Sequence, residues 1–195
     1  MYDSISYVIP IYNEELNIKN TINKIVDAFN ESSLKSYEII FIDDGSVDNS
    51  IKIIKSFLRN GLPIRCICLT RNFGHQQALT AGLDNAKKDL IAVLDGDLQD
   101  PPLVINEFIK AAEKGYEVVY GIRKKRKESI LKKISYGIFY KILSILSNIE
   151  IPLDSGDFCL MTKSALEKLN NLPEKNRFVR GLRSYIGLKQ IGIPY

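Results

Sequence analysis

Two aspartates one residue apart, Asp95 and Asp97, directly follow the apolar run at residues 90–94. Carboxylates at this spacing can converge on one hard cation, and oxygen ligands with open positions for phosphate suit Mg²⁺ or Mn²⁺. The same pair could instead end a strand, with one aspartate serving as a turn or cap residue. Gln99 and an acidic residue follow, and two prolines then start a predicted helix, so we favour the metal site.

Two further segments carry groups that could bind a nucleotide. Asp44 lies in an Asp-Asp-Gly-Ser segment, and its carboxylate could accept hydrogen bonds from a base or a ribose, or form only an Asx turn. Tyr12 and Glu14 place a ring and an acid near the N-terminus, where the ring could stack on a base or simply pack. Neither a GxGxxG nor a Walker motif occurs, so a metal and arginines would have to neutralise a diphosphate.

Each of these polar segments follows a run that is typical of a buried strand. We predict strands at residues 5–11, 38–42, 64–69, 90–94 and 117–120. Helical spacing of apolar residues predicts helices at 14–30, from 48 or 49 to 58, at 76–86 and at 101–114. This alternation indicates an α/β fold, a mostly parallel sheet with helices on both faces, in which ligands bind beyond the carboxyl ends of the strands.

Composition is that of a globular protein: 195 residues, 45% hydrophobic and 26% charged, with a net charge of +4. Basic residues concentrate at 124–133 and 175–183. Nucleic-acid binding is disfavoured because these clusters lack RNA-binding motifs and accompany acidic strand ends. Cys66, Cys68 and Cys159 form neither a metal pattern nor a disulfide framework. We expect Cys66 and Cys68, on one predicted strand, to be small core residues in a reducing compartment.

Six motifs in order carry a resemblance that covers nearly the whole chain. They are Pro10-x-Tyr12-Asn13-Glu14, Asp43-Asp44-Gly45-Ser46-x-Asp48, Arg71-Asn72-Phe73-Gly74, Asp95-x-Asp97-Leu98-Gln99-Asp100-Pro101-Pro102, Ser155-Gly156-Asp157-Phe158 and Arg177-Phe178-x-Arg180-Gly181. The chain resembles family 2 glycosyltransferases of the polyprenyl-phosphate branch, which includes dolichyl-phosphate mannose synthase and bactoprenol glucosyltransferases. The resemblance implies a GT-A-type, Rossmann-like domain, with a nucleotide-sugar-binding core at 1–122 and, at 123–195, an acceptor-side helical region facing the membrane.

The resemblance also implies roles for individual residues. The donor would contact Pro10, Tyr12, Glu14, Ile42, Asp44, Asp95, Gly96 and Arg123. The metal, Mg²⁺ or Mn²⁺, would be held by Asp97 and Gln99, with Asp95 as a further ligand. Asp97 and Asp157 would be the catalytic residues, and Arg177, Arg180 and Asp157 would meet the acceptor phosphate. Cys159 stands where an arginine is common, which puts one phosphate contact in doubt.

His75 is the only histidine. A histidine base is the default expectation for an enzyme. Here the residue lies between Gly74 and Gln76 at a predicted junction of loop and helix, so we expect a structural or supporting role.

Membrane contact is predicted for residues 129–149, which are mostly apolar and carry lysines at the start. Packing of this segment on its own domain is the alternative. We expect neither a signal peptide nor a membrane span in these residues, and a location at the cytoplasmic face of the membrane. Similar proteins usually continue with an arginine-rich segment and often with transmembrane helices, so the chain could be truncated or naturally short; homo-oligomerisation stays open.

The predicted function is inverting transfer of a sugar from a nucleotide-sugar donor to a polyprenyl phosphate. UDP-sugars are favoured as donors, with GDP-mannose as a further candidate. One alternative is a family 2 transferase with a saccharide hydroxyl acceptor, in which Asp157 would be an obligate base. A second alternative is a non-catalytic module that binds a nucleotide sugar or an anionic lipid.

Overall fold

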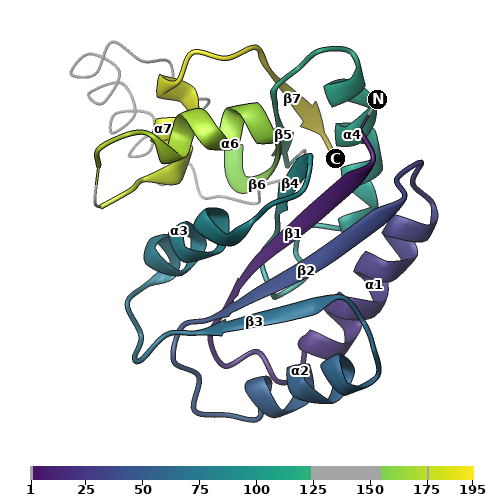
Figure 1. Ribbon diagram of the computed structural model, residues 1–195, viewed down its shortest axis with the longest axis vertical. Helices are drawn as coiled ribbons and strands as arrows, with labels where there is room; N and C mark the ends of the chain where they lie inside the picture. Colours follow the sequence, from purple (N-terminus) through teal and green to yellow (C-terminus); the bar gives the residue numbers. More distant parts are fainter. Residues whose placement is uncertain (1, 124–154, 175) are drawn as a thin grey trace, which may run out of the picture.

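A computed structural model describes residues 2–123, 155–174 and 176–195 of the chain (Figure 1). The strands are β1 (Ser4–Ile11), β2 (Ser36–Asp43), β3 (Ile64–Cys68), β4 (Leu90–Val93), β5 (Val118–Ile122), β6 (Ser155–Thr162) and β7 (Gln190–Pro194). The helices are α1 (Ile18–Asn30), α2 (Ser50–Arg59), α3 (His75–Asn85), the short 3₁₀ helix η1 (Pro102–Val104), α4 (Ile105–Glu113), α6 (Lys163–Asn170) and α7 (Val179–Tyr185).

The strands form one seven-stranded sheet in the order β3-β2-β1-β4-β6-β5-β7. All neighbouring pairs are parallel except those of β6, which runs antiparallel to both β4 and β5. The mostly parallel α/β sheet is therefore confirmed. The acceptor-side helical region expected at 123–195 contains α6 and α7, but it also contributes strands β6 and β7 to the same sheet. The membrane-contacting segment predicted at 129–149 lies outside the described residues.

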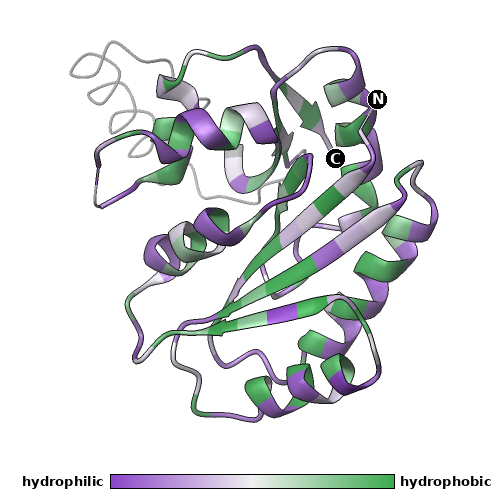
Figure 2. Ribbon diagram, in the orientation of Figure 1, coloured by the Kyte–Doolittle hydropathy of each residue, from purple (hydrophilic) through white to green (hydrophobic). Residues whose placement is uncertain are grey.

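Helices cover both faces of the sheet, as predicted, and enclose two hydrophobic cores. Helices α1, α2 and α4 pack on one face, and α3, α6 and α7 on the other (Figure 1). Strand β1 is buried from Ile5 to Ile11, which agrees with its predominantly apolar sequence. Hydrophobic residues dominate the central strands, whereas the helices carry both hydrophobic and hydrophilic residues (Figure 2). No helix in the described ranges is long and apolar enough to cross a membrane.

Helix α3 approaches the sheet closely at Gly82. A Cβ atom at this position would lie 2.5 Å from both Ile42 Cδ1 and Val8 Cγ1. Only glycine fits there without a shift in the neighbours, so α3 lies directly on β1 and β2. Ile42, predicted to contact the donor, is instead buried in the core beneath α3. The close contact fixes the N-terminus of α3, which carries His75, at the carboxyl edge of the sheet.

Two of the three cysteines correct the sequence-based expectation. Cys159, for which no position was predicted, is buried in β6. Cys66 is only half-buried and Cys68 is exposed. Both lie on β3, which among the described strands pairs with β2 alone and forms one edge of the sheet.

Candidate active site

A cavity of about 520 Å³ opens at the carboxyl ends of β1, β2 and β4. Its volume falls within the usual range for small-molecule sites. Among the residues that line it are the predicted donor and metal residues Pro10, Tyr12, Glu14, Asp44, Asp95, Gly96 and Asp97. The remaining lining residues are Ile11, Asn72, Gly74, His75 and Ala78, four of them outside the predicted strands. The topology therefore brings together the polar segments that follow three separate strands.

The loops after β1 and β2 are joined by hydrogen bonds at the mouth of this cavity. Asn13 adopts a φ of 56°, a conformation that asparagine tolerates better than most residues. Its backbone N–H donates to the Ser46 hydroxyl at 2.9 Å, and its side-chain oxygen accepts from the N–H of Val47 at 2.9 Å. The N–H of Glu14 donates to the Ser50 hydroxyl at 2.9 Å. These contacts join the loop that carries Tyr12 and Glu14 to the segment after β2.

Asp44 shapes the opposite wall of the cavity. Its carboxylate oxygens accept the backbone N–H groups of Phe73 at 2.7 Å and Gly74 at 2.9 Å. Gly45 has a φ of +78°, and a Cβ there would lie 2.7 Å from the carbonyl carbon of Arg71. The Asp-Asp-Gly-Ser segment and the segment before α3 therefore depend on each other. Asp44 also lines the cavity, and its contact with the nucleoside stays a prediction.

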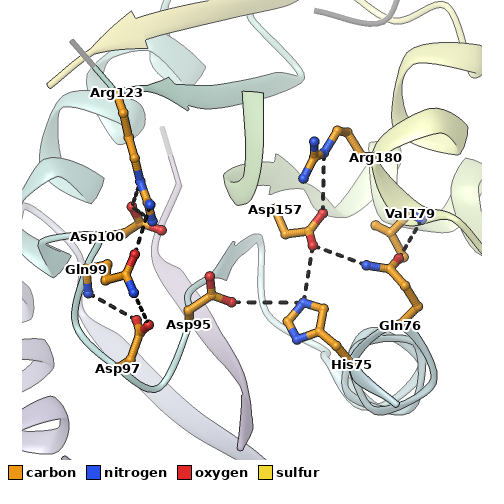
Figure 3. A network of polar contacts seen from close by, with 10 residues as sticks. All are labelled: His75, Gln76, Asp95, Asp97, Gln99, Asp100, Arg123, Asp157, Val179 and Arg180. Atoms are coloured by element: carbon orange, nitrogen blue, oxygen red, sulfur yellow. Dashed lines mark hydrogen bonds and ion pairs between the residues drawn. The ribbon is translucent and has the colours of Figure 1, made fainter. Parts of the chain in front are cut away.

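Asp97 begins a chain of contacts that leads away from the cavity (Figure 3). It accepts the N–H and the side-chain amide of Gln99 at 3.1 and 2.6 Å. The Gln99 oxygen accepts from Arg123 Nη1 at 3.0 Å, and Arg123 Nη2 lies 2.6 Å from the buried Asp100. The Tyr195 hydroxyl also donates to Asp100. Arg123, predicted to contact the donor, therefore pairs with Asp100 and does not line the cavity.

Asp157 lies on β6 and is held by side chains from two helices (Figure 3). Its Oδ2 is 3.2 Å from His75 Nε2 and accepts from the Gln76 amide at 3.1 Å. Its Oδ1 lies 3.8 Å from Arg180 Nε on α7. His75 Nε2 is also 3.9 Å from Asp95 Oδ1, so the histidine lies between the two acidic groups. Nothing in the sequence around His75 indicated that it would lie between Asp95 and Asp157.

The charges around Asp157 determine its protonation. Burial, with 11% of the side chain exposed, would raise its pKa, but the His75 hydrogen bond and the Arg180 charge outweigh burial and lower the pKa. The hydrogen bond to Asp157 in turn raises the pKa of His75. Desolvation raises the pKa of Asp95, partly opposed by His75. Asp157 is therefore an anion at neutral pH, and hence a weak base.

The two arginines predicted to bind the acceptor phosphate have different surroundings. Arg180 lies beside Asp157. Arg177 instead places Nη1 3.0 Å from both Asp84 Oδ1 and Asn170 Oδ1, and it links the end of α6 to α3. The structure does not bring Arg177 to the cavity, because its guanidinium forms these structural contacts.

Arg183 is a buried cation of α7 that the sequence pointed to only as a member of the basic cluster at 175–183. It is 1% exposed, and its Nη2 lies 3.5 Å from the carbonyl oxygen of Gly156. Its Nε and Nη1 have no hydrogen-bond partner among the described residues. Its charge contributes to the lowered pKa of Asp157. Arg183 thus supports the ionised state of Asp157 from inside the protein.

The residues near Asp97 suit a divalent cation of one particular kind. Within 2–123, 155–174 and 176–195, no group of three His, Cys, Asp or Glu side chains could hold a metal ion. Mg²⁺ is commonly held by one or two carboxylates, with substrate phosphates completing its shell. Asp95 and Asp97 line the cavity and provide such carboxylates. These two carboxylates therefore fit a hard cation that binds together with a diphosphate.

The sequence matches the family model described as glycosyl transferase family 2 over residues 6–170. The chain belongs to this family. It is 44% identical to the uncharacterized glycosyltransferase YkcC of Bacillus subtilis over 97% of the chain and 59% of that protein. It is 39% identical to a prophage bactoprenol glucosyl transferase homolog of Escherichia coli over 98% of the chain and 62% of that protein. The chain thus spans about three-fifths of these relatives.

A solved structure has the same fold. Glucosyl-3-phosphoglycerate synthase from Mycobacterium tuberculosis, in complex with Mn²⁺, UDP and glucosyl-3-phosphoglycerate, superposes with a TM-score of 0.67 at 18% identity. The match covers 98% of the chain and 70% of that structure. At this identity the likeness concerns the fold alone, which is the GT-A-like α/β fold of family 2 glycosyltransferases.

Proposed function

We propose that this glycosyltransferase moves a sugar from a nucleotide sugar to a polyprenyl phosphate, with inversion at the anomeric carbon. The observation that carries the proposal is the state of Asp157, a nearly buried carboxylate held as an anion beside His75, Gln76 and Arg180. Such a carboxylate can orient the acceptor substrate, but it is too weak a base to remove a proton from that substrate efficiently. A phosphate monoester suits this arrangement because its oxygen is already anionic near neutral pH.

On the donor side, Tyr12 and Glu14 line the cavity and would contact the nucleoside. Asp95 and Asp97 also line it and would act on the diphosphate through a bound cation. Asp97 and Asp95 would hold Mg²⁺ or Mn²⁺. Gln99, also predicted as a ligand, does not line the cavity; its amide donates to Asp97 and would orient that carboxylate. When bound, such a cation stabilises the charge that develops on the leaving nucleoside diphosphate. UDP is favoured as the nucleotide.

On the acceptor side, Arg180 would bind the lipid phosphate by charge-assisted hydrogen bonds. Asp157 would then orient the acceptor beside Arg180 without removing a proton. The relative named a bactoprenol glucosyl transferase homolog, 39% identical to the chain, supports a prenyl phosphate as the acceptor. A lipid acceptor would place the reaction at a membrane surface, and we propose the cytoplasmic face.

One observation favours a second candidate, a saccharide hydroxyl acceptor. His75 and Asp157 lie 3.2 Å apart, and a histidine beside a carboxylate can serve as a general base. An alcohol must lose its proton during attack, so this reaction would need that base. The two candidates therefore differ in what they require of Asp157.

A donor and acceptor panel tests the proposal. UDP-glucose, UDP-GlcNAc, UDP-galactose and GDP-mannose are each incubated with undecaprenyl phosphate or a saccharide, and nucleoside diphosphate release is measured. We expect release with one donor that depends on undecaprenyl phosphate, and NMR of the product should show an inverted anomeric centre. Donor binding without release would instead indicate a non-catalytic module.

A pH–rate profile of Asp157→Asn then separates the two acceptors. With a phosphate acceptor, we expect a lower rate and an unchanged profile shape. Loss of an acidic limb of the profile in this variant would favour the hydroxyl acceptor and overturn the proposal.

A further inference from the structure

A pair of thiols on β3 lies outside the cavity and takes no part in the proposed reaction. Cys66 and Cys68 are two residues apart on this edge strand, so their side chains point to the same face of the sheet. Their Sγ atoms are 3.8 Å apart. Cys66 is half-buried and Cys68 is exposed, so solvent reaches the pair from one side.

The separation of the sulfur atoms matches a particular chemistry. A disulfide requires an S–S distance of about 2.05 Å, far shorter than this separation. Two thiolates bound tetrahedrally to Zn²⁺ at about 2.3 Å would lie about 3.8 Å from each other. The observed separation fits a hydrogen bond between two thiols, and it equally fits two thiolates that share one cation.

We propose that Cys66 and Cys68 form a two-thiolate site for a thiophilic divalent cation, Zn²⁺ or Cd²⁺, with water completing its coordination. Thiolates select soft or borderline cations, whereas the carboxylates at Asp95 and Asp97 suit hard ones. The two sites are thus expected to take different metals, and excess Mg²⁺ should not displace the cation from the thiol pair.

The groups around the pair predict how binding depends on pH. Burial and the neighbouring Cys68 raise the pKa of Cys66 to about 12. This value includes the charge of Asp43 on β2, which raises the pKa, and that of Lys55 on α2, which lowers it. A cation must displace protons from the thiols, so binding should release protons and strengthen as pH rises.

A Cd²⁺ titration of the reduced protein in excess Mg²⁺ tests the site, followed by the ultraviolet thiolate-to-cadmium absorbance and by proton release. We expect saturation at one Cd²⁺ per chain. Cys66→Ser and Cys68→Ser should each weaken binding by roughly tenfold or more. Cys159→Ala is the matched control, because it removes a buried thiol elsewhere in the sheet, and it should leave the absorbance unchanged.

Two further measurements keep the test decisive. Alkylation of exposed Cys68 in the folded wild-type protein should abolish the absorbance, even if a serine variant does not fold. Asp97→Ala should retain it, which separates the thiol site from the proposed catalytic metal. Absence of the absorbance in the wild type, or its persistence in both serine variants, would overturn the proposal.

Discussion

The proposed donor side of the site, around Tyr12, Asp44 and Asp97, and the proposed acceptor side, around Asp157, are built in different ways. The donor side consists of loops that follow the parallel strands β1, β2 and β4, and it is held largely by bonds to backbone N–H groups. On the acceptor side, Asp157 lies on the antiparallel strand β6 and is held by side chains from α3 and α7. Topology therefore forms the donor cavity, whereas individual side chains assemble the acceptor side.

This difference implies different responses to substitution. Changes on the donor side should act through charge or through packing beneath the loops. Changes on the acceptor side should act through single hydrogen bonds and affect acceptor use alone. The following predictions test this division.

The largest effect is expected on the donor side, at Asp97. Asp97→Ala removes a carboxylate from the proposed cation site, and we expect turnover at saturating Mn²⁺ to fall by about 100-fold or more. Measurement of nucleoside diphosphate release checks this. Glu107→Ala, which removes an exposed acid of α4, is the control and should keep wild-type turnover. If Asp97→Ala keeps nearly wild-type turnover, the proposed role of a cation bound at Asp97 is wrong.

Packing beneath the donor loops gives the next effect. In Gly82→Ala, the new Cβ would clash with Ile42 and Val8, and such overpacking costs about 1–3 kcal/mol of unfolding free energy. Urea denaturation checks this value. Ile42→Val in the same background removes one clashing atom and should restore part of the loss. Equal stability of Gly82→Ala and the wild type would show that α3 is not fixed by this contact.

A smaller and more selective effect is expected on the acceptor side. The Gln76 amide donates to Asp157, and its oxygen accepts the N–H of Val179 at the start of α7 at 3.0 Å. Gln76→Met keeps the shape but loses both bonds, so kcat/KM for the acceptor should fall roughly tenfold, with donor KM unchanged. The matched control is Gln77→Met, at an exposed position on the same helix.

Hydrogen exchange provides a readout of this link that does not depend on activity. The Val179 amide should exchange faster in Gln76→Met but not in Gln77→Met. An equal loss of donor and acceptor kinetics in Gln76→Met would contradict the division between the two sides.

The smallest effect is expected at the opposite end of the parallel strands, remote from both sides. Asp89 accepts hydrogen bonds from the Ser4 hydroxyl and the Asp3 N–H, and the Ser4 bond chiefly lowers its pKa. A lowered folded pKa gives stability that is present above the ordinary value of about 3.9 and is lost as pH falls through the folded pKa. Asp89→Asn should therefore cost at most about 1 kcal/mol at neutral pH, and nothing in acid.

Urea denaturation of Asp89→Asn and the wild type, at neutral pH and in acid below the folded pKa of Asp89, measures this difference in unfolding free energy. Asp27→Asn is the control, because Asp27 is exposed and its carboxylate has no partner among the described residues. A cost of Asp89→Asn that persists in acid would mean that the charge of Asp89 is not its cause.

The donor side was predictable because each of its polar segments directly follows a buried apolar strand. This pattern alone is enough to place Tyr12, Asp44 and Asp95 at one edge of the sheet. The side chain of Ile42 does not line the cavity, because alternation along β2 turns it into the core below α3. The resemblance to the family pointed to Ile42 but could not predict which way its side chain faces.

The acceptor side was less predictable because its contacts join elements far apart in sequence. His75 Nε2 and Asp157 Oδ2 are 3.2 Å apart, yet the sequence around either residue does not predict this contact. Arg123 and Arg177 each find an acidic partner, Asp100 and Asp84, and which cation meets which acid depends on tertiary structure. Strand β6 was missed because it follows the region where the alternation of strands and helices lapses.

The position of β6 also affects how the chain reaches its native state. In β6, Cys159 pairs with Val93 of β4, so the middle of the sheet joins segments that leave the ribosome far apart in time. Until β6 arrives, the edge of β4 has no partner there, and the nascent chain exposes a template for misassembly. Because Asp157 lies on this same late strand, we expect partly folded chains to lack acceptor chemistry, so that activity appears only when the sheet is complete.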